Sequence, residues 1–398
     1  ISFAPHSFGF SPPGWFVCFG LLFFYQEAFL LATPTLHHYR NAVMGAGAFM
    51  IADYLSVPYG VVVKGAVIPA ALFFLSLIFY ADIAAARSGL KGLSGEELPD
   101  WKKTLAQKGH LLIPVIALVV FIVMGWSAIK TAFWSILFMI ALSFLKSETR
   151  MNSKKILDAL AAGSRDNISI AAACAAAGII VGVVSATGVG VKFSSLLNVL
   201  SASNPILALI LTMIAALILG MGLPPTAVYI ILAALTIPSL ISMGVNPLAA
   251  HFFVFFFASI GAITPPVCLA AYSAAAVAKT DPFVTGWKSF RMGLVGYIVP
   301  FIFVINPVLL MQQGSGIEIA SAFISAAIGV ILLTFGMEGF FKKPLHMVVR
   351  VLLLISALLL MIPGFRTDVI GIAGLFLAII TDRLMSPKNT DSLGAKVQ

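Results

Sequence analysis

The apolar run of residues 203–243 is interrupted once, by Gly220-Met221-Gly222-Leu223-Pro224-Pro225-Thr226. Proline lacks an amide hydrogen and its ring clashes with the preceding turn, so the proline pair ends a helix here. Glycine permits backbone conformations that other residues avoid. In hydrocarbon such a break survives only where protein or a watery cavity surrounds it. We therefore interpret residues 203–243 as a re-entrant hairpin, although two full spans would return the chain to the same side.

A second break of the same kind interrupts the apolar run of residues 250–278, at Gly261-Ala262-Ile263-Thr264-Pro265-Pro266. A new half-helix is expected to begin at Val267. Freed carbonyl oxygens and nearby hydroxyls suit a hard cation such as sodium, and the amide ends of half-helices suit an anion. Two facing breaks would combine a cation site with a carboxylate site, as at the midplane of transporters. The alternative interpretation is a pair of ordinary proline kinks.

The composition is that of a membrane protein. Of the 398 residues, 60% are hydrophobic and 10% are charged, whereas soluble domains carry about 25% charged residues. The net charge of +9 indicates basic cytoplasmic loops that obey the positive-inside rule, not nucleic-acid binding. The fold class we predict is an all-α polytopic membrane protein with about ten spanning helices, a re-entrant hairpin and broken helices.

Spanning helices need roughly 20 mostly apolar residues to cross the hydrocarbon. The runs that approach this length are 65–86, 111–126, 128–145, 167–187, 291–311, 318–335, 347–363 and 368–382. We expect Arg165 and Asp166 to open the helix at 167, since an acidic residue near a helix start complements its dipole. The stretch 14–33 is a weaker candidate because polar residues interrupt it. With alternating crossings every basic cluster falls on one face, which places the carboxy terminus in the cytoplasm.

The sequence contains two segments that resemble each other. Residues 43–49 followed by Pro58 resemble residues 267–272 followed by Pro282, with the same spacing from valine to proline. Each copy precedes a long span that contains a proline. The predicted topology gives the two spans opposite directions, which is typical of an inverted-topology repeat. Chance similarity between segments of small residues is the alternative.

Four segments together resemble one family of transporters. They are residues 172–184 (Ala-Ala-Cys-Ala-Ala-Ala-Gly-Ile-Ile-Val-Gly-Val-Val) with Thr187-Gly188, 219–224 (Leu-Gly-Met-Gly-Leu-Pro), 250–255 (Ala-His-Phe-Phe-Val-Phe) and 262–267 (Ala-Ile-Thr-Pro-Pro-Val). They are similar to the large membrane subunit of tripartite ATP-independent periplasmic (TRAP) transporters, most closely the variety fused to its small subunit that works with TAXI-type binding proteins. The resemblance spans about residues 43 to 382. It implies an elevator-type, inverted-repeat importer, like those of the ion transporter superfamily, that couples organic acids such as C4-dicarboxylates to sodium.

The resemblance also implies which residues form the site. The cation would be held by Gly220, Gly222, Pro224, Thr226, Gly261, Ala262, Thr264 and Pro265, and one wall of the substrate site by Thr226, Ser259, Thr264 and Val267. Pro225 stands where the family more often has a second threonine, which removes one hydroxyl ligand. Na⁺ is the implied coupling ion, and no other cofactor is expected. The implied partners are a TAXI-type periplasmic solute-binding protein, a small membrane subunit or its fused equivalent, an organic anion and the lipid bilayer of the bacterial inner membrane.

The expected domain division has five parts. They are an unmatched amino-terminal segment (1–42), a remnant of the first repeat (43–86), a linker with scaffold helices (87–155), the second repeat (156–311) and carboxy-terminal helices with a short tail (312–398). Arg40-Asn41-Ala42 stands where the family has a proline pair after a first hairpin, so residues 1–42 are interpreted as a truncated or frame-shifted reading. On this interpretation the chain alone catalyses no sodium-driven uptake.

Other functional classes fit the sequence less well. No HExxH, Gly-x-Ser-x-Gly or paired intramembrane aspartate indicates an enzyme, and no phosphate-binding loop indicates a pump. A passive channel, which also uses broken helices, and a non-transporting fragment or scaffold subunit remain alternatives. We interpret His251 as an ordinary interfacial histidine, and Gly178 and Gly182 as positions that allow close helix contact.

Overall fold

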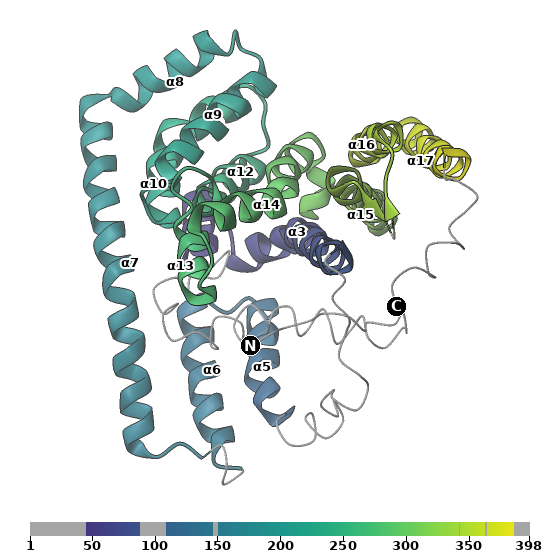
Figure 1. Ribbon diagram of the computed structural model, residues 1–398. Helices are drawn as coiled ribbons and strands as arrows, with labels where there is room; N and C mark the ends of the chain where they lie inside the picture. Colours follow the sequence, from purple (N-terminus) through teal and green to yellow (C-terminus); the bar gives the residue numbers. More distant parts are fainter. Residues whose placement is uncertain (1–44, 88–108, 146–149, 342, 363, 386–398) are drawn as a thin grey trace. The chain divides into compact units, whose positions relative to one another are not determined.

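The computed structural model describes residues 45–87, 109–145, 150–341, 343–362 and 364–385. Helices dominate these residues (Figure 1). In chain order the α-helices are α2 (Gly45–Leu55), α3 (Tyr59–Arg87), α5 (Ile113–Val123), α6 (Ala128–Ser143), α7 (Ser153–Thr187), α8 (Val189–Leu200), α9 (Pro205–Gly220), α10 (Pro225–Leu235), α11 (Ile237–Ser242), α12 (Pro247–Ile260), α13 (Leu269–Ala278), α14 (Pro282–Ile305), α15 (Gly316–Glu338), α16 (Met347–Met361) and α17 (Phe365–Met385). The 3-10 helices are η2 (Gly109–Leu112), η3 (Gly261–Ile263) and η4 (Pro307–Leu310), and the strands β1 (Phe340–Phe341) and β2 (Lys343–Pro344) pair antiparallel. The all-α prediction is confirmed for the part of the chain that the structure describes.

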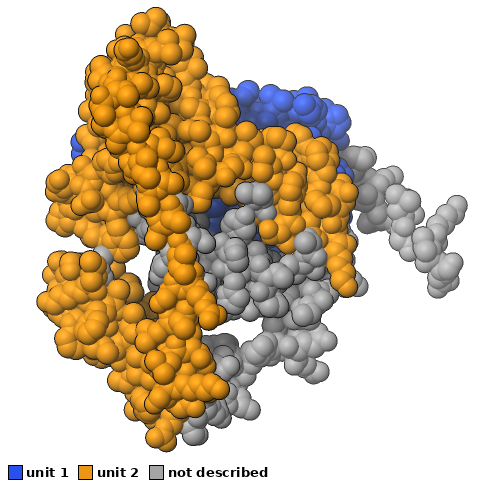
Figure 2. All heavy atoms as spheres, turned by 90° about the vertical axis from the view of Figure 1, so that its left-hand side faces the viewer, with its two compact units in different colours: residues 1–10, 68–94, 305–398 blue, residues 11–67, 95–304 orange. Residues whose placement is uncertain are grey.

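The chain divides into two compact units (Figure 2). Unit 1 comprises residues 1–10, 68–94 and 305–398, and unit 2 comprises residues 11–67 and 95–304. Unit 2 contains both helix breaks, and unit 1 contains the carboxy-terminal helices. The five-part division remains a prediction, because it concerns repeats and not compact units.

Each long apolar run predicted from the sequence coincides with a helix. Among the described residues, α3, α14 and α15 are long and apolar enough to cross a membrane, and the end of α7 joined to α8 adds a fourth span if the bent pair is counted as one. The other apolar helices, such as α9 and α12, contain 10–17 residues. The total of about ten spanning helices therefore remains a prediction.

Both predicted helix breaks are present. α9 ends at Gly220 and α10 begins at Pro225, with Pro224 extended between them (φ −58°, ψ 143°). α12 ends at Ile260, and η3 leads into a non-helical segment before α13. The second half-helix begins at Leu269 and not at Val267, because Cys268 adopts a left-handed conformation (φ 40°, ψ 43°).

The start of α7 departs most from the predicted boundaries. We expected the helix to open at residues 165–167, but it begins at Ser153, where the side chain of Asn152 accepts a hydrogen bond of 2.8 Å from the amide of Lys155. The polar segment between these points is rich in alanine, leucine and lysine, which favour helix, and it contains no proline. The helix ends where Gly188 takes a left-handed conformation (φ 66°), and the chain bends by 80° into α8.

The two segments that resemble each other in sequence share a local structure. In each, a short helix (α2 or α13) is followed by a residue with positive φ, Ser56 (51°) or Lys279 (54°). A long helix with an internal proline then begins, α3 with Pro69 or α14 with Pro300. The inverted relation of the two copies remains a prediction.

Caps at both ends stabilise α15 in unit 1. Ser315 and Glu318 form a capping box at its start. At its end, the guanidinium of Arg350 from α16 donates hydrogen bonds to the carbonyl oxygens of Gly336 (3.0 Å) and Met337 (2.9 Å). The last carbonyls of a helix have no partner inside it, so the arginine satisfies groups that would otherwise need water.

Candidate functional site

The two helix breaks meet backbone to backbone at Gly220 and Gly261. A Cβ atom on Gly261 would lie 2.8 Å from the Cα atom of Gly220, and a Cβ atom on Gly220 would lie 3.1 Å from the carbonyl oxygen of Ala258. Contacts this short leave no room for a side chain at Gly261 unless the backbone moves. The contact therefore requires glycine, and it confirms the expectation that the two breaks lie together.

Each proline pair removes hydrogen-bond donors from carbonyl groups at this contact. In an α-helix the amide of residue i+4 donates to the carbonyl of residue i. Pro224-Pro225 lack amide hydrogens, so the carbonyls of Gly220-Met221 lose their helical donors. Pro265-Pro266 have the same effect on Gly261-Ala262, where the amide of Thr264 instead donates to Gly261 over 3.2 Å. Carbonyl oxygens without helical donors therefore lie on both sides of the contact, at Gly220 and Met221 of the first break and at Ala262 of the second.

Two threonine hydroxyls of the hairpin are buried without a hydrogen-bond partner among the described residues. They belong to Thr226 in the first turn of α10, which is 4% exposed, and to Thr212 within α9, which is 0% exposed. An unsatisfied buried hydroxyl costs about 1–3 kcal/mol. Thr226 also lies at the helix start, where amide groups carry partial positive charge. Its hydroxyl is therefore available to a ligand bound at the break.

The hydroxyls of the second break are bonded within the protein. Ser259 donates to the carbonyl of Phe255 over 2.9 Å. Thr264 donates to the carbonyl of Ile260 over 2.8 Å and accepts a hydrogen bond from the hydroxyl of Tyr297. Both hydroxyls keep lone pairs for a ligand. Sequence reasoning missed Tyr297, because an aromatic residue in an apolar helix carries no signal of a polar contact.

Comparison with known proteins decides the family. The sequence matches the family described as "Tripartite ATP-independent periplasmic transporter, DctM component" over residues 43–315, a range that contains both breaks. The chain belongs to this TRAP transporter family. No curated protein matches the TRAP subunit. No solved structure matches it either.

Membership establishes the class of the TRAP subunit. It is a multi-pass membrane component of a transporter, which confirms the resemblance to a large membrane subunit. The family is one of transporter components and not of enzymes. The match ends at residue 315, so α15, α16 and α17 lie beyond it.

The remaining predicted site residues of the TRAP subunit differ in how far protein buries them. Gly222 and Pro224 are exposed, and a Cβ atom on Gly222 would meet nothing within 4 Å. Ala262, Pro265 and Val267 are half-buried. The structure thus brings Gly220 and Gly261 into contact, whereas no contact it describes joins Gly222 or Pro224 to the second break.

A buried polar pair near the site was missed by the sequence. The hydroxyl of Tyr229 lies 2.7 Å from Nδ1 of His251. His251 is 5% exposed, so protein encloses it. Its interpretation as a histidine at the depth of the membrane interface remains a prediction. The close helix contact expected at Gly178 and Gly182 is absent from the described residues, since a Cβ atom at either would meet nothing within 4 Å.

Proposed function

We propose that this TRAP subunit is the permease component of a sodium-coupled secondary transporter, which imports small organic acids, C4-dicarboxylates among them, delivered by a TAXI-type periplasmic binding protein. The contact of Gly220 with Gly261 carries the proposal. It joins two sets of carbonyl oxygens without helical donors, and the unpartnered hydroxyl of Thr226 follows the first break. Neutral oxygens are the ligands that hard cations take, so this set supports a sodium site.

The same geometry supports an anionic substrate. α10 begins at Pro225 and α13 at Leu269, directly after the two breaks. The first amides of a helix have no partner inside it and carry partial positive charge, which stabilises a carboxylate. A sodium ion at the adjacent carbonyls would strengthen this field and thereby couple the two binding events. The substrate wall we propose consists of Thr226, Ser259, Thr264 and Val267.

The proposed setting is the bacterial inner membrane, with the carboxy terminus in the cytoplasm. The support for this orientation is the location of basic residues in the loops and helix ends, such as Lys154 and Lys155 in the first turn of α7 and Arg383 in the last turn of α17. A small membrane subunit, separate or fused, is the further proposed partner.

Sodium binding is tested by thermal unfolding of the chain in phosphatidylcholine nanodiscs, with sodium chloride replacing choline chloride at constant ionic strength. Sodium at ten times its Kd is expected to stabilise the folded state by about 1.4 kcal/mol, which raises Tm by about 2–4 °C. Thr226→Ala is expected to lose most of this rise, because it removes the unpartnered hydroxyl at the break.

Thr212→Ala is the matched control. Its hydroxyl is equally buried and unpartnered in the same hairpin, but it lies within α9 and away from the break. This variant is expected to keep the sodium response. A wild-type protein that does not respond to sodium, or two variants that respond alike, would contradict the proposed site.

Flux without substrate separates a carrier from a passive channel. Liposomes that contain the chain are given a sodium gradient and no organic acid. A coupled carrier moves no sustained sodium current under these conditions, whereas a channel conducts. A steady sodium conductance would therefore contradict the proposal of a coupled carrier.

A further inference from the structure

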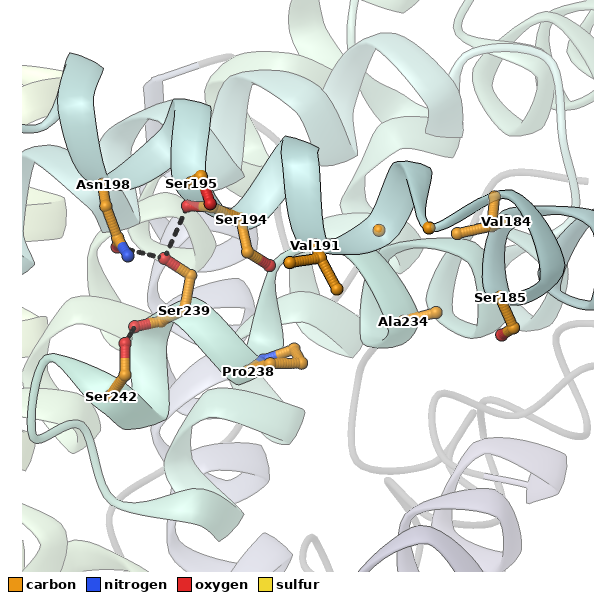
Figure 3. Close-up of a pocket in the computed structure, with 12 residues that line it drawn as sticks. Val184, Ser185, Val191, Ser194, Ser195, Asn198, Ala234, Pro238, Ser239 and Ser242 are labelled. Carbon is orange, nitrogen blue, oxygen red and sulfur yellow. Dashed lines mark hydrogen bonds between the residues drawn. The ribbon is translucent and has the colours of Figure 1, made fainter.

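Unit 2 contains a second oxygen-rich region, a cavity of about 340 Å³ between α8 and the segment α10–α11 (Figure 3). Its polar wall is formed by Ser194 and Asn198 of α8 together with Ser239 and Ser242 of α11. We call it the elbow cavity, because α8 follows the 80° bend after α7. None of the residues that line it belongs to either helix break.

α8 exposes several apolar side chains and turns two polar ones inward. Its outward side chains include Leu196 (53% exposed) and Val199 (75% exposed). Two of its polar residues, Ser194 and Asn198, are turned inward and are half-buried over the cavity, whereas Lys192 and Ser195 are exposed. In a membrane subunit this arrangement places the apolar face against lipid. The polar face then lies over the cavity, where its remaining polar groups can bind an occupant.

The hydroxyl hydrogens of the polar wall are used within the protein. Ser194 donates to the carbonyl of Leu235 over 2.9 Å, and Ser239 donates to Oδ1 of Asn198 over 2.5 Å. Ser242 donates to the carbonyl of Ser239 over 2.8 Å. A serine hydroxyl has one hydrogen and two lone pairs. What these three hydroxyls retain for an occupant is therefore acceptor capacity.

The backbone adds acceptors on the same side. Pro238 has no amide hydrogen, so the carbonyl of Ala234 lacks its helical donor. A Cβ atom on Gly190 would lie 3.5 Å from that carbonyl oxygen, which shows how closely α8 approaches it. α10 ends at Leu235, and the carbonyl end of a helix carries partial negative charge. The cavity thus presents mainly hydrogen-bond acceptors, with the side-chain amide of Asn198 as a donor beside them, and suits an occupant that donates several hydrogen bonds.

We propose that the elbow cavity binds the primary ammonium head group of a membrane phospholipid, of which phosphatidylethanolamine is the simplest. The residues that line the cavity include no charged side chain, so no lysine or arginine among them repels an ammonium group. The volume holds roughly ten water-sized groups, far more than a bare ion fills. Val184, Val191 and Pro238 form an apolar wall that suits the methylene groups of the lipid. This site is independent of the proposed sodium site.

The test compares phosphatidylethanolamine with phosphatidylcholine, which shares its phosphate and glycerol but carries a trimethylated nitrogen without N–H donors. Lipid retained by the purified chain is counted by native mass spectrometry, and Tm is measured in nanodiscs of each lipid. The wild type is expected to retain phosphatidylethanolamine and to unfold at a higher temperature with it. Ser239→Ala and Ser242→Ala are expected to weaken this preference about tenfold, the effect of losing one hydrogen bond to a charged group.

Two controls keep the outcomes distinct. Ser321→Ala removes a hydroxyl of α15 that donates to the carbonyl of Glu318 in its own helix, and it is expected to leave the preference unchanged. Thr226→Ala is also expected to keep the lipid preference. Loss of the sodium site can therefore be told apart from loss of the lipid site. A wild type without preference between the two lipids overturns the proposal, as does a preference that survives both cavity variants. A sodium response in phosphatidylcholine that Ser239→Ala abolishes would assign the cavity to a free cation and overturn it equally.

Discussion

Tyr229 of α10 and His251 of α12 are joined by a hydrogen bond of 2.7 Å that protein encloses on all sides. The ring of Tyr54 from α2 completes the cluster, at 6.0 Å from the ring of Tyr229 and 5.8 Å from that of His251. The hairpin is therefore attached to the broken helix at two points of different chemistry. One is the backbone contact of Gly220 with Gly261, and the other is this polar pair.

Tyr229→Phe is expected to lower the free energy of unfolding by about 1–3 kcal/mol, because it keeps the ring but leaves a buried histidine nitrogen without its partner. The measurement is Tm in nanodiscs. Tyr54→Phe is the control, since Tyr54 is 47% exposed and contacts the pair through its ring, which the variant keeps. Equal losses in the two variants would show that the hydrogen bond does not stabilise the pair.

Gly220→Ala is expected to separate the two breaks. The new methyl group would lie 3.1 Å from the carbonyl oxygen of Ala258 and 3.2 Å from Cα of Gly261, so backbone must move. We expect a loss of stability of about 1–3 kcal/mol and loss of the sodium-dependent rise in Tm. Gly222→Ala adds the same methyl group in open space and is expected to fold normally. A Gly220→Ala protein with wild-type stability and sodium response would show that neither depends on the glycine contact.

Arg350→Met is expected to destabilise unit 1 by about 1–3 kcal/mol, because it leaves the last carbonyls of α15 without the guanidinium. Arg350→Lys should restore part of the lost stability, because a lysine ammonium can still donate to these carbonyls but lacks the planar guanidinium that reaches both. Arg366→Met removes an exposed arginine from the first turn of α17 and serves as the control. Chemical unfolding followed by circular dichroism measures all three, and indistinguishable curves would contradict the cap.

Asn152→Ala is expected to loosen only the start of α7. Loss of this cap costs about 1 kcal/mol of helix stability. Hydrogen exchange should therefore accelerate at residues 153–160 and stay unchanged around Ala177, which packs on Ala227 and Ile231 of α10. Acceleration along the whole helix, or none at its start, would contradict a local cap.

The sequence predicted the helices and both breaks because each depends on local chemistry. An apolar run of sufficient length folds as helix in hydrocarbon, and a proline pair ends a helix wherever it stands. The same local reasoning failed at α7. The polarity of residues 153–166 predicts a helix that starts later, whereas a helix can continue out of hydrocarbon when its residues favour helix and a cap satisfies its first amides.

The sequence by itself determined where the backbone loses its hydrogen-bond donors and the family to which the chain belongs. Only the tertiary structure decided that Gly220 touches Gly261, that Tyr229 bonds to His251, and that the serines of α8 and α11 share a cavity. The physical reason is that each of these contacts joins helices far apart along the chain. Their approach is set by how whole faces pack, and no periodicity within either helix contains that information.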